Sequence, residues 1–428
     1  MDNILIILTD KYPYDKGETY IETERPYWSK FDHVYICPVL VRKEDKVRES
    51  FSAMPHETVI GTEDNKPGLL SALRGLFGPV TISDYFRELK TLKRSGRLSL
   101  GNVRLLIFMG ILSNLRIKRI KKALKPLLGD RKNEKRLLYS YWMYEPAIAA
   151  TGLVGKLDCD RLISRVHRYD LYEELQKTGY IPFRERVMKK LDRLYSISDD
   201  GVKYFHEHYD GRYDGKIFIS RLGTVRKYEV CKAGKGEETV IASCSNLIPV
   251  KRVGLIIDAL KKYDKPITWY HFGDGVLRDE LEAQVKTLPG NVHARLMGFT
   301  LNDDIQRFYS EHYIDAFVNV SSSEGVPVSI MEAQSYGLPV IATDAGGTGE
   351  LVHNGKNGVL LDIGFSDDDL LSAVEEVRGK GAQYRKGALE TWENMSDSEK
   401  ICDEFFDREI GILNDVRIGD RENEFITQ

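Results

Sequence analysis

The sequence predicts an α/β protein with two doubly wound, Rossmann-like domains that face a deep cleft. The length of 428 residues suits two to three domains. Short β-branched or aromatic runs alternate with helical patterns along the chain, which is typical of parallel sheets joined by right-handed crossovers. Several of these runs are almost continuously apolar, as expected for strands that are buried on both faces.

The expected strands fall into two sets. In the first half of the chain they are 4–9, 34–38, 137–141, 162–167, 194–198 and 217–220. In the second half they are 239–243, 267–273, 292–297, 314–320, 339–343 and 358–361. Helical patterns lie between them, for example at 253–262, 276–288 and 302–310.

The periodicity is interrupted at residues 221–238, where glycine and charged residues are mixed. We therefore expect an N-terminal domain at 1–225 and a C-terminal domain at 226–395. A last helix and a charged tail follow at 396–428, and a return of this helix to the N-terminal domain is one option. The triplet Asp367-Asp368-Asp369 indicates a helix start, because acidic side chains stabilise that end of the helix dipole.

Composition and charge exclude several classes of protein. The 62 Lys and Arg against 65 Asp and Glu leave a net charge of −3, unlike a nucleic-acid-binding polycation. The five cysteines are widely spaced without a C-x-x-C pair, which argues against a disulfide framework and favours a reducing compartment. The N-terminus lacks the features of a signal peptide, and the longest uncharged apolar run, 105–115, is shorter than a membrane span. We therefore expect a cytoplasmic protein.

The segment 87–125 departs from this rhythm, because it holds twelve Lys and Arg against one acid, Glu88, among many apolar residues. A basic amphipathic helix of this kind can lie on the anionic inner face of a cell membrane. Its apolar face can equally pack on its own domain while the lysines meet water. The sequence leaves these two interpretations open.

The strongest chemical signal is the stretch 322–333, in which Glu324 and Glu332 flank a glycine turn and a helix start near Pro327. Glu324 then stands at the carboxyl end of a strand, where open α/β sheets bind ligands. The N–H groups of Val328 and Ser329 at the start of the helix form an anion site. Glu332, later in this helix, can accept hydrogen bonds from a diol such as ribose.

The E-x7-E pattern of Glu324 and Glu332, followed by A-x-x-x-G-x-P-V-I-A-T-D-x-G-G, resembles the donor site of retaining glycosyltransferases of family 4, which have the GT-B fold. The resemblance is strongest over 239–362 and weakest over 45–135. Further segments that resemble the family are S-N-L-I-P-V-K-R at 245–252, G-D-G-V-L-R at 273–278, M-G-F at 297–299, K-G-E-T at 16–19 and S-R-V-H-R-Y-D at 164–170.

The resemblance implies a transferase that moves a sugar from a nucleotide diphosphate donor, such as UDP-GlcNAc or UDP-glucose, to a glycan or lipid-linked acceptor. Capsule, exopolysaccharide or O-antigen assembly is the implied setting. The domain 1–225 would serve the acceptor and the domain 226–395 would bind the nucleotide sugar. Lys251 would neutralise the donor diphosphate, Glu324 would hold sugar hydroxyls and His167 would reach the sugar ring across the cleft.

The other donor-binding residues that the resemblance implies are Gly17, Asn246, Arg252, Gly273, Gly298, Phe299, Gly325, Val326, Pro327, Val328, Ser329 and Glu332. Asn246 stands where the family usually has Arg. Arg252 and Arg221 are the candidates to replace the diphosphate contact of that Arg.

We expect no cofactor, no obligatory divalent metal and no nucleic-acid partner. Asp158-Cys159-Asp160 spells a D-x-D metal motif, but it precedes a strand away from the donor residues. His206 and His208, two positions apart, do not share a helix face. Two other functions stay open, namely a nucleotide-sugar epimerase or hydrolase of the same fold and a non-catalytic nucleotide-sugar-binding assembly protein.

Overall fold

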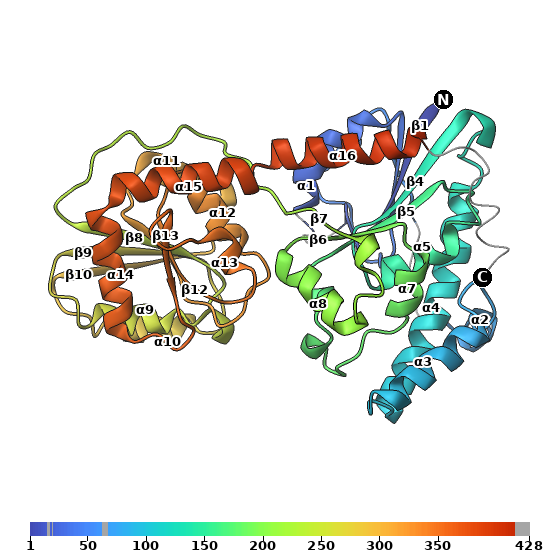
Figure 1. Ribbon diagram of the computed structural model, residues 1–428, viewed down its shortest axis with the longest axis horizontal. Coiled ribbons are helices and arrows are strands. Elements are labelled where there is room, and N and C mark those ends of the chain that lie inside the picture. The colour runs from blue at the N-terminus through green and yellow to red at the C-terminus, as the bar shows by residue number, and fades with distance from the viewer. Residues whose placement is uncertain (15–17, 19, 62–66, 416–428) are drawn as a thin grey trace. The chain divides into compact units, whose positions relative to one another are not determined.

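The computed structural model describes residues 1–14, 18, 20–61 and 67–415 (Figure 1). The chain divides into two compact units. The N-terminal unit comprises Met1–Ile197, Gly201–Ser220 and the chain from Cys402 onward. The C-terminal unit comprises Ser198–Asp200 and Arg221–Ile401.

The N-terminal unit contains a seven-stranded sheet of order β3-β2-β1-β4-β5-β6-β7, in which all neighbours are parallel. This order reverses direction between β1 and β4, which is the topological switch point of a Rossmann-like sheet. Its strands are β1 (Asp2–Thr9), β2 (His33–Pro38), β3 (Glu57–Val59), β4 (Glu134–Ser140), β5 (Arg161–Val166), β6 (Arg193–Ser196) and β7 (Ile217–Ile219). The helices along this part of the chain are α1 (Ile21–Glu24), α2 (Leu69–Gly75), α3 (Ile82–Arg94), α4 (Leu100–Leu124), α5 (Glu145–Leu153), α6 (Arg168–Leu171), α7 (Arg184–Lys190) and α8 (Asp199–Tyr209).

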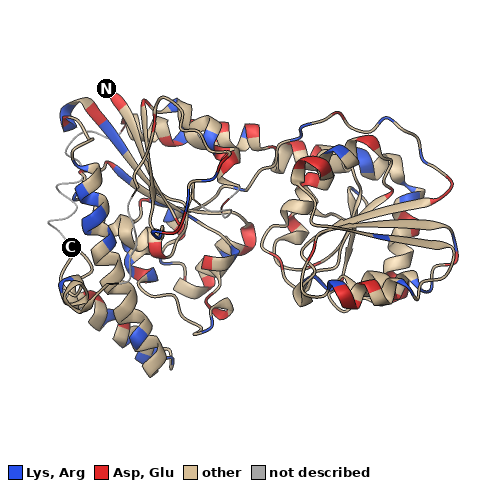
Figure 2. Ribbon diagram, turned by 180° about the vertical axis from the view of Figure 1, so that it is seen from behind, with Lys and Arg blue, Asp and Glu red and all other residues tan. Residues whose placement is uncertain are grey.

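The C-terminal unit repeats the same architecture with a six-stranded parallel sheet of order β10-β9-β8-β11-β12-β13 and a switch point between β8 and β11. Its strands are β8 (Thr239–Cys244), β9 (Ile267–Phe272), β10 (Val292–Gly298), β11 (Ala316–Asn319), β12 (Val340–Thr343) and β13 (Gly358–Leu361). Its helices are α9 (Gly254–Leu260), α10 (Arg278–Val285), α11 (Asn302–Glu311), α12 (Val328–Ser335), α13 (Thr348–Leu351), α14 (Asp367–Gly379) and α15 (Gly381–Met395). The strands of this C-terminal sheet carry a single charged residue, Arg295 in β10, whereas the surrounding helices carry many (Figure 2).

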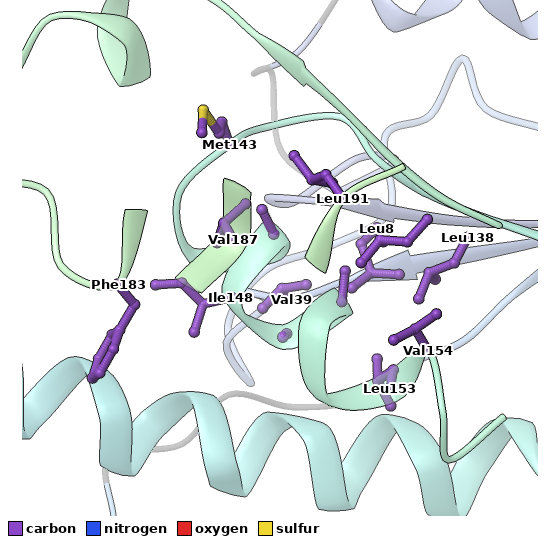
Figure 3. Close-up of a cluster of buried hydrophobic side chains, with 14 of the residues drawn as sticks. Leu8, Val39, Leu138, Met143, Ile148, Leu153, Val154, Phe183, Val187 and Leu191 are labelled. Carbon is purple, nitrogen blue, oxygen red and sulfur yellow. The ribbon is translucent and has the colours of Figure 1, made fainter. Parts of the chain in front are cut away.

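Both faces of the N-terminal sheet are buried. Ile4, Ile6 and Leu8 of β1 join a core cluster on one face of the sheet, whereas Leu5 and Ile7 join a second cluster on the other face. Figure 3 shows part of the first cluster, in which side chains from β1, β4, α5 and α7 pack together beside α4. Burial on both faces explains why the strand sequence reads as a continuous apolar run.

The last helix, α16 (Ser398–Asp415), returns the chain to the N-terminal unit. Phe405 and Phe406 lie in the second core cluster of that unit. The buried carboxylate of Glu409 accepts a hydrogen bond from Tyr195 and pairs with Arg161 at 3.2 Å. Apolar packing and a buried ion pair therefore hold α16 against the N-terminal sheet.

The two parallel-sheet α/β domains confirm the predicted fold class, and the cleft between them stays a prediction. All twelve expected strands are present, with ends displaced by at most three residues. The edge strand β3 was not expected, because three residues are too few to form a recognisable pattern. Residues 221–238 contain neither a helix nor a strand, and α14 begins at Asp367 with the capping residue Ser366 before it.

The basic segment 87–125 is not one helix. It covers most of α3 and all of α4, which are separated by a break with Gly96 in the left-handed region at φ 69°. With 25 residues, α4 is long and apolar enough to span a membrane by length and composition. The prediction from the uncharged run 105–115, which is shorter than a membrane span, was therefore wrong about the length of this apolar helix. Half of its apolar stretch is buried within the protein. The buried Asn114 amide bonds to the backbone of Val80 and Gly75, as in a helix that packs inside its own domain.

Candidate active site

The residues of the E-x7-E stretch lie at the switch point of the C-terminal sheet. β8 and β11 are neighbours there, and the loops that follow their carboxyl ends meet. The N–H of Ser322 in the β11 loop donates to the carbonyl of Val250 in the β8 loop at 2.9 Å. This position is the one at which doubly wound sheets bind their ligands.

Lys251 and Glu324 form an ion pair at this point, with Lys251 Nζ 2.6 Å from Glu324 Oε1. Asn319, the last residue of β11, donates to the same carboxylate oxygen at 3.3 Å. The Glu324 residue is only 9% exposed, so its charge is largely removed from water and depends on these partners. The fold thus brings together two residues that are 73 positions apart in the sequence.

A glycine pair shapes the turn that carries Glu324 and Gly325. Gly346 has φ 57°, and a Cβ atom there would lie 2.1 Å from the Glu324 carbonyl oxygen. A Cβ atom on Gly347 would lie 2.5 Å from the Gly325 oxygen, which accepts the Gly347 N–H at 2.7 Å. The D-x-G-G part of the motif therefore lets the β12–α13 loop lie directly against the Glu324 turn.

The first turn of α12 presents backbone donors next to this turn. Pro327 is the N-cap, and the buried Val326 precedes it. Within the described ranges, the N–H groups of Val328 and Ser329 donate no backbone hydrogen bond outside the helix. Such N–H groups at the positive end of a helix dipole attract an anion.

Glu332 lies one turn further along α12. Asn302 at the start of α11 donates to its carboxylate at 2.5 Å. Burial raises the pKa of Glu332 to about 7, so the group is partly protonated at neutral pH. A hydroxyl ligand with hydrogens to donate would favour the ionised form.

Two glycines bring the β9 and β10 loops to the same edge of the sheet. Gly273 N donates to the Gly298 oxygen at 2.9 Å. A Cβ atom on Gly273 would lie 1.9 Å from the Ser245 carbonyl oxygen, so this position requires glycine. Phe299 follows Gly298 and is 78% exposed, and Asn246 on the β8 loop is also exposed.

The two arginines expected to replace the missing contact at Asn246 have protein partners. The Arg252 guanidinium donates to the carbonyl oxygens of Val320 at 2.8 Å and Ile363 at 2.7 Å. Arg221 pairs with Asp199 and Glu350. A phosphate contact from either arginine would share the guanidinium group with these partners.

A buried polar chain lies beneath the β8 loop, and no pattern in the sequence predicted it. Trp269 Nε1 donates to Ser243 Oγ at 2.9 Å, and Ser243 Oγ lies 2.8 Å from His271 Nδ1. His271 Nε2 lies 3.1 Å from the Ser245 carbonyl oxygen. Burial lowers the pKa of His271 to about 4, so a neutral imidazole supports the loop that begins at Ser245.

In the N-terminal unit, His167 follows β5 and packs in an aromatic cluster. Its ring centroid lies 4.5 Å from that of Trp142 and 5.0 Å from that of Tyr141. Neither ring nitrogen has a hydrogen-bond partner among the described residues. Burial and the nearby charge of Arg165 lower the pKa of His167 well below its usual value, so the ring is neutral.

Asp170 organises the backbone around His167. Its carboxylate accepts the N–H of His167 at 2.7 Å and that of Met143 at 2.5 Å. Burial raises the pKa of Asp170 to about 7. The H-x-x-D pattern therefore joins the ends of β4 and β5.

Glu18 is a second organising residue, which sequence reasoning did not single out. Its carboxylate accepts the N–H groups of Asp10, Lys11 and Tyr12 at 2.7–3.0 Å and the Trp142 indole N–H at 2.7 Å. The available signal was its place in the K-G-E-T segment at 16–19. The expected glycine contact at Gly17, beside it, lies outside the described residues.

Asp10, at the end of β1, belongs to the same group. The Tyr144 hydroxyl donates to its carboxylate. Burial, reinforced by the neighbouring Glu18 charge, raises the pKa of Asp10 to about 8. The described part of this edge thus holds two acids, Asp10 and Asp170, with raised pKa values close to a neutral histidine.

The D-x-D triplet has a structural role at its last residue. Asp160 accepts the Arg136 N–H at 2.7 Å and pairs with Arg131. His206 pairs with Asp214 at 2.7 Å.

In the part of the chain that the structure describes, no three His, Cys, Asp or Glu side chains are grouped as metal ligands. The expected independence from metal stays a prediction.

Parts of the chain are similar to known glycosyltransferases. Residues 229–386 match the protein-family model described as glycosyl transferases group 1. Over 145 residues the chain is 31% identical to the amylovoran biosynthesis glycosyltransferase AmsK of Erwinia amylovora, covering 31% of this chain and 34% of that protein. Over 140 residues it is 31% identical to the O-antigen biosynthesis glycosyltransferase WbnH of Escherichia coli, covering 32% of this chain and 37% of that protein. The chain therefore matches little more than a third of the length of these relatives.

Solved structures resemble the chain over almost its full length. The lipopolysaccharide outer core galactosyltransferase WaaB has a TM-score of 0.66 at 15% identity, covering 95% of this chain and 99% of that chain. HepE of Anabaena, in complex with UDP, has a TM-score of 0.62 at 16% identity, covering 96% of this chain and 100% of that chain. The chain has the GT-B fold, and its residues 229–386 match the glycosyl transferases group 1 model.

Proposed function

We propose that the protein is a retaining glycosyltransferase of family 4. It transfers a sugar from a nucleotide diphosphate donor, in our proposal a UDP-hexose or UDP-N-acetylhexosamine, to a glycan or lipid-linked acceptor. The names of the relatives, in amylovoran and O-antigen biosynthesis, support the assembly of a surface polysaccharide as the setting. The UDP bound to HepE supports the choice of base. In this proposal the reaction takes place in the cytoplasm, at the inner face of the cell membrane.

The observation that carries the proposal is the Lys251–Glu324 pair beside the start of α12. A diphosphate at this point would meet the Lys251 ammonium and the N–H groups of Val328 and Ser329. These donors stabilise the negative charge that grows on the leaving group as the glycosidic bond breaks. Glu324 would bind hydroxyl groups of the transferred sugar.

The proposed reaction balances without a nucleophile from the protein. The bond between the anomeric carbon and the β-phosphate oxygen breaks, and the acceptor oxygen bonds to the anomeric carbon from the same face. The acceptor proton passes to the departing phosphate.

His167 is neutral, so one ring nitrogen can accept a hydrogen bond and the other can donate one to a sugar hydroxyl. Glu332 would accept the two ribose hydroxyls.

In this proposal the cationic side chain and the helix N-terminus replace a divalent metal. We therefore expect full activity in excess EDTA. Activity that EDTA abolishes and Mn²⁺ restores would overturn this part of the proposal.

The test is a thermal-shift panel of UDP-, GDP- and dTDP-sugars with free UDP and GDP. A ligand present at 100 times its Kd stabilises the folded state by about 2.7 kcal/mol, which raises Tm measurably. We expect a shift with one base, and Glu332→Ala should remove it. Glu311→Ala, an exposed acid at the end of α11, is the matched control. No shift with any nucleotide, or an unchanged shift in Glu332→Ala, would contradict the proposed site.

A non-catalytic nucleotide-sugar-binding protein is the second candidate. It is favoured by Asn246 and by the backbone contacts that Arg252 makes. This candidate predicts nucleotide binding without turnover, and Glu324→Ala would then change affinity alone. An epimerase or hydrolase would instead release a new nucleotide sugar or free sugar without an acceptor. Product analysis with the labelled donor separates these outcomes.

A further inference from the structure

The outward side of α2, α3 and α4 exposes an unusual amount of apolar surface. We call the exposed side chains of residues 69–127 the α2–α4 surface. Its exposed apolar members are Leu69, Leu70, Leu73, Phe77, Ile82, Phe86, Leu98, Leu100, Ile107, Phe108 and Leu127. On and just after α2, Leu69, Leu70, Leu73 and Phe77 are each 52–80% exposed. Contiguous exposed apolar side chains usually mark a site of contact with a partner or a membrane.

The same segment is strongly basic, although the whole chain carries a net charge of −3. Its thirteen cationic residues are Arg74, Arg87, Lys90, Lys93, Arg94, Arg97, Arg104, Arg116, Lys118, Arg119, Lys121, Lys122 and Lys125. Its two acids, Asp84 and Glu88, are buried, and Asp84 already pairs with Arg186 at 2.6 Å. Figure 2 shows Lys and Arg spread along the helices of this segment. The exposed charged side chains of the α2–α4 surface are therefore cationic.

A cavity of about 730 Å³ lies at the last turns of α4. It is lined by Gly78, Pro79, Ile117, Lys118, Lys121, Lys122, Lys125, Pro126 and Lys156. Lys118 Nζ donates to the carbonyl oxygens of Arg74 and Phe77, which ties the end of α2 to α4. Within the described ranges, none of the five lysines forms an ion pair. Clustered ammonium groups without a counter-charge attract a phosphate.

The opposite face of α4 is packed inside the N-terminal unit. Ile117, Ile120 and Leu124 are fully buried in the core cluster. Arg116 points into the protein and pairs with Glu145. The two interpretations of the basic segment thus apply to different faces of α4. One face packs inside the N-terminal unit, and the other exposes basic and apolar side chains to solvent.

We propose that the α2–α4 surface docks on an anionic phospholipid bilayer. The exposed apolar side chains of α2 enter the boundary between headgroups and acyl chains, and a lipid phosphate occupies the lysine-lined cavity. Charge complementarity selects this partner, because two copies of a strongly cationic surface repel each other. The exposed leucines and phenylalanines distinguish the surface from a polar nucleic-acid-binding face. The inference does not depend on the reaction proposed above.

The test is co-sedimentation of the full chain with vesicles of phosphatidylcholine, alone or with phosphatidylglycerol. We expect binding only to the anionic vesicles, and weaker binding in high salt because salt screens the lysines. The triple variant Lys121→Gln, Lys122→Gln, Lys125→Gln should weaken binding at least about tenfold, given the usual contribution of each basic residue near an anionic surface. Leu70→Ser with Phe77→Ser should weaken it as well, because these substitutions remove the apolar part of the contact.

Matched controls separate this surface from net charge and general hydrophobicity. The triple variant Lys43→Gln, Lys46→Gln, Lys177→Gln changes the same charge at exposed sites of the same unit, and it should bind like the unaltered protein. Circular dichroism checks that each variant is folded, and the nucleotide thermal shift reports the proposed donor site separately.

Three results would overturn the inference. The first is absence of binding to anionic vesicles, and the second is equal loss of binding in the two lysine triple variants. The third is a dimer in sedimentation velocity that Leu70→Ser with Phe77→Ser dissociates, because a second copy would then cover the apolar face. Inorganic phosphate that binds the lysine cavity of a protein unable to bind vesicles would identify a soluble anion instead.

Discussion

The Glu18 carboxylate provides the most direct test of the N-terminal unit. It accepts four N–H donors, two on each oxygen, from Asp10 and Trp142 on Oε1 and from Lys11 and Tyr12 on Oε2. Glu18→Gln keeps the shape of the side chain but replaces one oxygen with an NH₂ group. Whichever way the amide is oriented, two of the four donors lose their acceptor and face another donor.

The expected cost follows from this count. A buried donor left without a partner costs about 1–3 kcal/mol, so two donors cost roughly 2–6 kcal/mol. In a domain of about 150–250 residues, each kcal/mol lowers Tm by about 2–4 °C. We therefore expect Glu18→Gln to lower the Tm of the N-terminal unit by at least about 4 °C.

The measurement is urea and thermal unfolding followed by circular dichroism and tryptophan fluorescence. Glu174→Gln is the matched control, because among the described residues this exposed acid accepts side-chain hydrogen bonds from the Tyr204 hydroxyl alone, at 3.3–3.4 Å. Where the new NH₂ group takes the position of Oε1, Trp142 loses its hydrogen bond and the near-ultraviolet spectrum should change as well. A Glu18→Gln protein as stable as the control would show that the carboxylate does not hold the β1 loop.

Three further predictions concern single residues. Lys251→Ala should lower kcat/KM at least about tenfold, because it removes a charge-stabilising group, and unchanged kinetics would exclude Lys251 from the site. Because burial raises the pKa of Asp10 to about 8, the folded state holds a proton that the unfolded chain releases above about pH 4, so stability should fall as pH rises from about 4 to 8. Asp10→Asn should flatten the dependence of Tm on pH over that range, and parallel curves would contradict the assignment. Gly346→Ala should destabilise the C-terminal unit by at least about 1–3 kcal/mol in urea unfolding, because its φ is 57° and its Cβ would lie 2.1 Å from the Glu324 oxygen. Gly364→Ala, where a Cβ meets open space, is the control, and equal stability of the two variants would refute the steric argument.

Much of the fold could be predicted from the sequence because parallel strands buried on both faces have a local pattern. The apolar runs at 4–9 and 239–243 each mark a central strand of one sheet, and both are present as β1 and β8. The glycine turn and proline before α12 likewise determine where that helix starts. The strand β3 lacks such a pattern, since it is short and lies at the edge of its sheet.

The candidate site was predictable residue by residue where a motif is contiguous, as in 322–333. The tertiary contacts of those residues could not be predicted from the sequence. The ion pair of Lys251 with Glu324 joins two loops of the C-terminal sheet, and the bond of Glu18 to Trp142 joins residues 124 positions apart. The two protein contacts of Arg252 could not be inferred from its place next to Lys251.

By itself, the sequence determined the two parallel sheets and the place of the E-x7-E turn, because strand burial, helix capping and glycine turns depend on neighbouring residues. Only the tertiary structure decided that α16 packs on the N-terminal unit and that α4 has one buried face and one exposed basic face. Both outcomes depend on which distant surfaces remain uncovered after the sheets form. A charged and apolar stretch has the same local pattern whether another element covers it or not, so its role is settled by packing.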